Sequence, residues 1–186
     1  MSKYPSPRSK DQAPKKVTPA KIKHSALNLL SRREYGSAEL AQKLNQKFRG
    51  AEVVFIKDPF TDGPDETGQL ELVDMVDQIV FELVEDNMVS DQRFADSLVR
   101  SRWNRGYGPY YVRQELRQKG VGTELVEECM ENFDENWTEV AQRKAQVRFA
   151  GLEDSRTLWT KAANYLQRKG FDRELINQAL GDMPKS

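Results

Sequence analysis

The sequence is poor in the side chains on which most enzyme and metal sites depend. Its 186 residues include one cysteine, Cys129, and one histidine, His24. A single cysteine excludes an internal disulfide, and a single histidine excludes a His-based catalytic triad or a multi-histidine metal site within one chain. Cys129 falls on an apolar helical face beside Met130, which favours a buried structural thiol over a nucleophile.

Long apolar runs and nucleotide-binding motifs are also missing. Uncharged apolar stretches such as residues 53–56 are far too short to span a bilayer, and no apolar core follows the basic N-terminal residues. There is no phosphate loop, and Gly106-Tyr107-Gly108 lacks the third glycine of a dinucleotide motif. We therefore expect a cytoplasmic protein that is not an enzyme, with no membrane contact, no cofactor and no metal.

Charge is abundant but unevenly placed. The chain is 38% hydrophobic and 31% charged, with 29 basic and 29 acidic side chains, so its formal net charge is zero. Residues 51–91 are nevertheless strongly acidic, whereas residues 92–120 and 140–186 are basic. Alternating blocks of this kind predict surface patches of opposite sign, although a charged face that merely solvates the protein is the alternative for any single block.

Apolar residues recur at helical spacing along most of the chain. We predict an all-α fold of three tandem three-helix repeats that form an elongated, curved body. Its parts are a disordered basic tail at residues 1–22, a first repeat at 23–89 with an irregular acidic insertion at about 49–69, a second repeat at 90–136 and a third at 137–186.

Internal sequence matches support the repeats. Lys119-Gly120-Val121 recurs fifty positions later as Lys169-Gly170-Phe171, and Tyr35-Gly36 matches Tyr107-Gly108. Leu44, Leu116 and Leu166 occupy corresponding positions. Each unit is too small to be stable alone, so neighbouring units are expected to cover one another's apolar faces.

The positive functional signal is a basic and aromatic stripe in the second unit, RSRWNRGYGPYYVRQELRQKGV at residues 100–121. Arginine binds carboxylates or phosphates with two parallel hydrogen bonds, and tyrosine is a common interface anchor. The predicted partner-binding residues are Arg93, Arg100, Arg102, Arg105, Tyr107, Tyr110, Arg113, Arg117 and Lys119.

Some members of this stripe have alternative, structural interpretations. Tyr107 could brace a turn, either Tyr110 or Tyr111 could pack inward, and Trp103 fits a core position better than a contact. Charge alone does not identify the partner, because nucleic-acid phosphate and an acidic protein groove select the same arginines. The acidic block at 51–91 argues against a simple clamp on a long DNA duplex.

The central string resembles the signature of the bacterial RecX regulatory proteins, with its RSR, Gly-x-Gly-Pro turn, EL pair and KG ending. MVSDQRFADSLVRSR and ALNLLSRREYGSAELAQKL resemble the same family, so the likeness covers about residues 23–180. The acidic insertion and the basic tail depart from the family pattern, and the third unit lacks the RSR and Gly-Tyr-Gly-Pro features.

The resemblance implies curved tandem three-helix repeats and a modulator that binds RecA or the RecA–DNA filament. Such proteins inhibit the recombinase, ATPase and coprotease functions of RecA, and some bind DNA directly. On this basis we expect a non-enzymatic monomer whose partner is RecA or its filament, with possible contact to single- or double-stranded DNA. The alternative is a helical-repeat protein that binds DNA directly.

Overall fold

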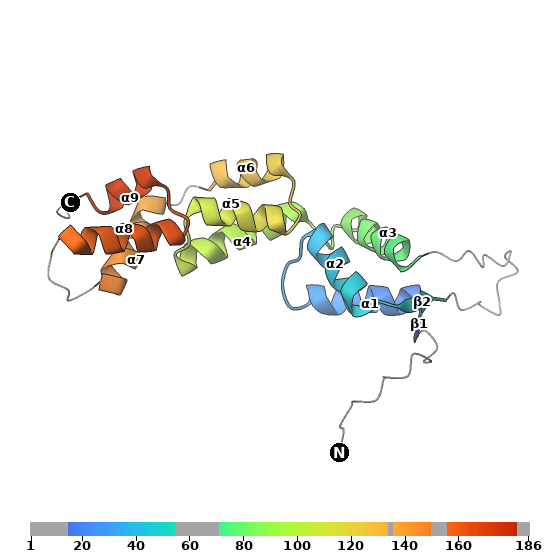
Figure 1. Ribbon diagram of the computed structural model, residues 1–186. Helices are drawn as coiled ribbons and strands as arrows, with labels where there is room; N and C mark the ends of the chain where they lie inside the picture. The colour runs from blue at the N-terminus through green and yellow to red at the C-terminus, as the bar shows by residue number, and fades with distance from the viewer. Residues whose placement is uncertain (1–14, 55–70, 134–135, 150–155, 182–186) are drawn as a thin grey trace, which may run out of the picture.

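The computed structural model describes residues 15–54, 71–133, 136–149 and 156–181, and these form three helical bundles in a row (Figure 1). Unit 1 contains α1 to α3 with two short strands, unit 2 contains α4 to α6, and unit 3 contains α7 to α9. The elements are β1 (Lys15–Val17), α1 (Pro19–Leu30), α2 (Ser37–Lys47), β2 (Ala51–Val53), α3 (Leu72–Glu85), α4 (Asp91–Arg105), α5 (Pro109–Gln118), α6 (Thr123–Glu131), α7 (Trp137–Phe149), α8 (Arg156–Arg168) and α9 (Arg173–Ala179). The predicted all-α class and its three-helix repeat are confirmed.

Each unit has its own apolar core. The matched leucines Leu44, Leu116 and Leu166 lie on the second helix of their units, and each is 0% exposed. The repeated sequence pattern therefore corresponds to a repeated packing position. Trp137 packs against the cores of both unit 2 and unit 3, so these two bundles share part of their apolar surface.

Helix starts follow ordinary capping chemistry. Thr18 accepts a hydrogen bond from the backbone of Lys21, and Pro19 occupies the first turn of α1, where a missing N–H costs nothing. The hydroxyl of Ser90 caps α4 in the same way, and the carboxylate of Asp172 caps α9. These caps fix where one helix of each unit begins.

The two strands correct one sequence-based prediction. β1 and β2 pair in parallel, with Lys15 opposite Ala51 and Val17 opposite Val53. The disordered tail predicted for residues 1–22 is therefore wrong for residues 15–22, because Val17 is 2% exposed in the first core and α1 begins at Pro19. Residues 1–14 and most of the predicted insertion lie outside the described residues.

The Lys-Gly turns end the second helix of units 2 and 3. Gly120 and Gly170 have φ of 84° and 88°, a conformation that L side chains rarely adopt. The next residue then folds back: the N–H of Val121 donates to the Leu116 carbonyl at 3.1 Å, and that of Phe171 to Leu166 at 3.2 Å. Both glycines thereby turn an apolar side chain, Val121 or Phe171, into the core.

Candidate partner-binding site

The predicted binding residues all belong to α4, α5 and the turns that flank them, but they do not form one free surface. Many of the cations make ion pairs within the chain, and these pairs have two distinct roles. Some join helices of unit 2, and others join unit 2 to unit 1. The residues with such pairs are Arg93, Arg102, Arg113, Arg117 and Lys119.

Arg102 ties α4 to α5. Its Nε and Nη2 donate to the two carboxylate oxygens of Glu115, each at 2.6 Å, in the two-pronged geometry that arginine favours. The side chains are only 21% and 15% exposed. The hydrogen bond to Glu115 raises the pKa of Arg102 above its ordinary value, so the guanidinium is charged and occupied. Arg102 is consequently a structural clamp in this state.

Arg113 and Arg117 share one carboxylate on α6. Nε of Arg113 and Nη2 of Arg117 each donate to Glu127 at 2.8 Å, one to each oxygen. The hydrogen bond from Arg113 lowers the pKa of Glu127 below its usual range. These side chains are between 33% and 47% exposed, so a partner could reach them only in competition with Glu127.

Lys119 holds unit 2 against unit 1. Its Nζ lies 2.5 Å from Oε1 of Glu39, and Arg33 donates to both oxygens of the same carboxylate at 3.0 and 3.1 Å. Glu39 is 4% exposed. Burial by itself raises the pKa of Glu39, but the hydrogen bonds from Arg33 and Lys119 outweigh it and hold that pKa below its ordinary value. The buried carboxylate therefore stays ionised between two cations.

Further polar contacts complete the joint between units 1 and 2. Arg93 donates to Glu34 at 3.3 Å and to the side chain of Asn87 at 2.7 Å. Asp91 accepts from the backbone N–H of Ser37 at 2.7 Å and from its hydroxyl at 2.8 Å, so an acid of α4 caps the start of α2. In this structure Arg93 therefore links unit 2 to unit 1.

Tyr107 braces the joint between units 2 and 3, in agreement with its alternative structural interpretation. Its ring stacks on Tyr111 with centroids 4.3 Å apart, and Nζ of Lys169 lies 4.3 Å above it. Beside it, two backbone hydrogen bonds cross the joint: Gly108 N–H donates to the Lys169 carbonyl at 2.8 Å and Tyr110 N–H to that of Gly170 at 3.0 Å.

Arg100, Arg105 and Tyr110 remain available to a partner. Both arginines are exposed, and within the described ranges neither makes an ion pair. Tyr110 is 61% exposed and its hydroxyl only accepts from Gln114 at 2.9 Å. Arg105 also borders a cleft of about 310 Å³ between units 1 and 2, whose other basic walls are Arg33, Arg102 and Lys119. The partner-binding prediction is therefore concentrated on these three residues.

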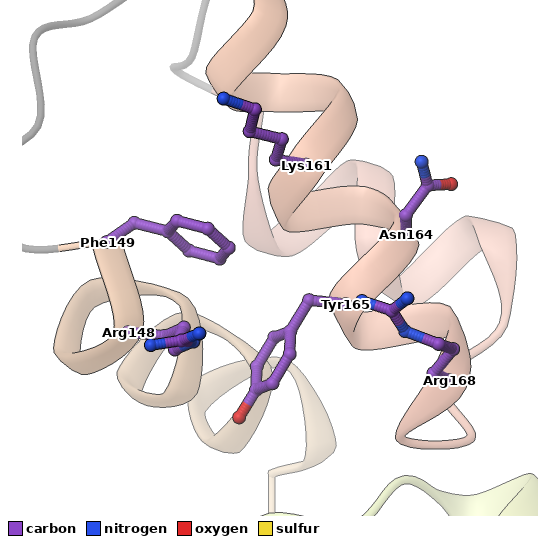
Figure 2. Close-up of a pocket in the computed structure, with 6 residues that line it drawn as sticks. All are labelled: Arg148, Phe149, Lys161, Asn164, Tyr165 and Arg168. Carbon is purple, nitrogen blue, oxygen red and sulfur yellow. The ribbon is translucent and has the colours of Figure 1, made fainter.

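A second basic and aromatic cluster, which the sequence analysis did not single out, lies in unit 3. It borders a pocket of about 360 Å³ between α7 and α8, shown in Figure 2, and consists of Arg148, Phe149, Lys161, Asn164, Tyr165 and Arg168. The excess of basic residues in 140–186 was a signal for it. The sequence did not show that Arg148 packs beside α8, because that depends on tertiary contacts.

Cys129 lies in the core of unit 2, as predicted, and its environment makes it unreactive. Burial raises the pKa of its thiol to about 11, and the nearby Asp96 adds to the rise. We expect iodoacetamide to alkylate it at pH 8 more than about 100-fold slower than free cysteine, because only the thiolate reacts. Mass spectrometry of the folded and urea-unfolded protein would measure this, and similar rates in both states would contradict it.

None of the described helices combines the length and apolar character needed to cross a bilayer. No group of three or more His, Cys, Asp or Glu side chains in this part of the chain could hold a metal ion.

Comparison with known families matches each bundle separately. The first three-helix domain of RecX matches residues 23–54, the second matches 90–130 and the third matches 134–180. A "Regulatory protein RecX" of Stenotrophomonas maltophilia is 35% identical over 175 residues, which are 93% of this chain and 91% of the relative. One from Halorhodospira halophila is 33% identical over 159 residues, or 85% of each chain.

Solved structures agree with the fold. The crystal structure of RecX from Lactobacillus salivarius superposes with a TM-score of 0.64 at 21% identity, covering 88% of this chain and 95% of that one. A second structure of a regulatory protein RecX gives the same TM-score at 24% identity and covers 88% and 72%. The arrangement of bundles is therefore shared with proteins whose sequences have diverged widely.

Proposed function

Because the chain belongs to the RecX family of regulatory proteins, we propose that it binds RecA or the RecA–DNA filament and modulates, mainly inhibits, the recombinase, ATPase and coprotease activities of RecA. It acts without chemistry of its own, as a monomer in the cytoplasm. The main support for this proposal is that family matches fall on all three bundles, so the whole scaffold is that of this regulatory family.

The shape of the molecule fits a large partner. A specific interface typically buries about 1,600 Å² in total, which one small bundle supplies with difficulty. Three bundles in a row offer a longer surface (Figure 1). A body of this form can contact more than one subunit of a polymer, which suits a filament better than a single globular partner.

Within this surface, we assign the direct contacts to Arg100, Arg105 and Tyr110. The two arginines are exposed and lack ion pairs in the part of the chain that the structure describes, so their desolvation by an acidic partner breaks no internal bond. Tyr110 adds an exposed ring on the neighbouring helix α5. Arg113 and Arg117 would contribute only by releasing Glu127.

Reversing the two free charges tests the assignment. We expect Arg100→Glu/Arg105→Glu to raise the protein concentration that half-inhibits DNA-dependent ATP hydrolysis by RecA at least about tenfold, because like charges would face the partner's acids. The measurement is a titration of preformed RecA–DNA filaments, with circular dichroism to confirm an unchanged helical fold.

The matched control is Arg32→Glu/Arg173→Glu, which changes the net charge equally at two exposed arginines outside the cleft. It should inhibit like the unaltered protein. Equal inhibition by both double variants would refute the site. A wild-type protein that leaves the ATPase of preformed filaments unaffected would refute the proposed function itself.

A further inference from the structure

The unit 3 cluster places two aromatic rings between cations of two helices. Phe149 at the end of α7 and Tyr165 on α8 meet edge to face, with centroids 5.9 Å apart and an interplanar angle of 84°. Figure 2 shows the rings turned toward one another across the gap, with Arg148 beside them and Lys161 and Arg168 along α8. The pocket volume of about 360 Å³ lies within the range of ligand sites, roughly 300–1,000 Å³.

Among the described residues that line this pocket, every charged side chain is positive. Arg148, Lys161 and Arg168 are all exposed, and none makes an ion pair within the described ranges. None of the described residues that line the pocket is an aspartate or a glutamate. The cations of unit 2 differ in this respect, because glutamates neutralise most of them. Three such charges around one pocket attract an anion that carries several separated negative groups.

The spacing of the two cations on α8 limits the kind of anion that they can bind together. Lys161 and Arg168 are seven residues apart, so they share a face of the helix and lie about 10 Å apart along its axis. Tyr165 lies between them on that face, and Asn164 also lines the pocket. Two cations at this distance cannot easily hold one phosphate, but they can hold successive phosphates of an extended strand.

We propose that this pocket binds single-stranded nucleic acid. A base stacks on the ring of Tyr165 with Phe149 beside it, while Arg148, Lys161 and Arg168 contact the phosphates around it. Aromatic rings combined with a cationic groove are the usual means of binding single strands without sequence preference. A duplex fits less well because its bases are stacked on one another, and an acidic peptide would not need the rings.

Binding to naked DNA tests this site independently of any RecA contact. The full chain is titrated into a fluorescently labelled single-stranded oligothymidylate, with anisotropy read at several salt concentrations. We expect Arg148→Ala/Lys161→Ala/Arg168→Ala to lower the steepness of log K against log salt by about 2, since each phosphate contact on a single strand contributes about 0.7. Near 0.1 M salt the affinity should fall about 100-fold.

The matched control removes the same residue types elsewhere. Arg32→Ala/Lys43→Ala/Arg173→Ala deletes two arginines and one lysine that are exposed and make no ion pair with any described residue. It should keep both the affinity and most of the salt dependence. An equal loss in the two triple variants would show only general electrostatic attraction and would overturn the site.

The ring is tested separately. Tyr165→Phe keeps the aromatic face and should bind as the unaltered protein does, whereas Tyr165→Leu should lose at least about fivefold in affinity through lost stacking. Unchanged binding by Tyr165→Leu would show that no base stacks on this ring. Retained DNA affinity in the unit 3 triple variant, together with lost binding to RecA filaments, would assign the pocket to an acidic protein surface instead.

Discussion

Gly108→Ala is expected to loosen unit 3 from unit 2 and to destabilise the protein by about 1–3 kcal/mol. A Cβ at this position would lie 2.4 Å from the carbonyl carbon and oxygen of Gly170, and backbone atoms cannot move aside as a flexible side chain can. The same displacement would break the two backbone hydrogen bonds from Gly108 and Tyr110. The φ of Gly108 is −85°, so the backbone conformation itself suits alanine and the effect reports on the close approach alone.

Gly122→Ala is the matched control. Both glycines precede a helix, and neither caps it with a side chain, but a Cβ on Gly122 would meet nothing within 4 Å. Urea unfolding followed by tryptophan fluorescence suits the comparison, because Trp103, Trp137 and Trp159 all pack on the third core. If the two variants unfold at the same urea concentration, the joint does not depend on this contact.

Removing both cations around Glu39 is expected to lower the stability of the folded protein strongly. Arg33→Met/Lys119→Met leaves a carboxylate that is 4% exposed without its partners, and an uncompensated buried charge costs about 3–5 kcal/mol. Urea unfolding monitored by circular dichroism gives the loss. Adding Glu39→Gln to this variant should restore much of the stability, because the buried charge is then gone.

The pH dependence of stability should have opposite signs in the unaltered protein and in Arg33→Met/Lys119→Met. In the unaltered protein the pKa of Glu39 is depressed, so its contribution to stability is present above the ordinary carboxyl value of 4.5 and is lost as the pH falls through the lowered pKa. In Arg33→Met/Lys119→Met only burial remains, which raises that pKa, so stability should increase as the pH falls toward it. A difference in stability between the two proteins that stays constant from pH 7 to about pH 4 would contradict this account.

The sequence predicted the repeats well because repetition is visible without knowing any contact. Leu44, Leu116 and Leu166 lie at equivalent buried positions, and the recurring Gly120 and Gly170 form equivalent turns. Local patterns of apolar residues, caps and glycines determine helices, and these patterns are short-range. The failure at residues 15–22 has the opposite cause, since strand β1 is stabilised by β2, about 35 positions away.

The candidate site was only partly predictable. Sequence identified a cluster of cations, but the acids that neutralise many of them lie elsewhere: Glu39 on α2 and Glu127 on α6 are brought to the stripe only by packing. The repeated Lys-Gly motifs also have a role that the sequence did not reveal, which is to make contacts between units. Lys119-Gly120 contacts Ala38 and Glu39 of unit 1, and Lys169-Gly170 contacts Tyr107 and Tyr111 of unit 2, so these motifs recur where units meet.

The unit 3 cluster could not be predicted from the sequence. Its cations are distributed over two helices and belong to no motif, so their meeting depends on how α7 packs against α8. The number of charges in the segment did not show that the described lining residues include no acid, because residues 140–186 also contain aspartates and glutamates.

The two joints should respond differently to ionic strength. Ion pairs are the main polar contacts between units 1 and 2, where Gly120 also lies against Ala38, whereas two backbone hydrogen bonds and a close approach of Gly108 to Gly170 join units 2 and 3. Dissolved ions weaken the first kind of contact far more than the second. Raising the salt concentration should therefore loosen the contact between units 1 and 2 before it affects the contact between units 2 and 3.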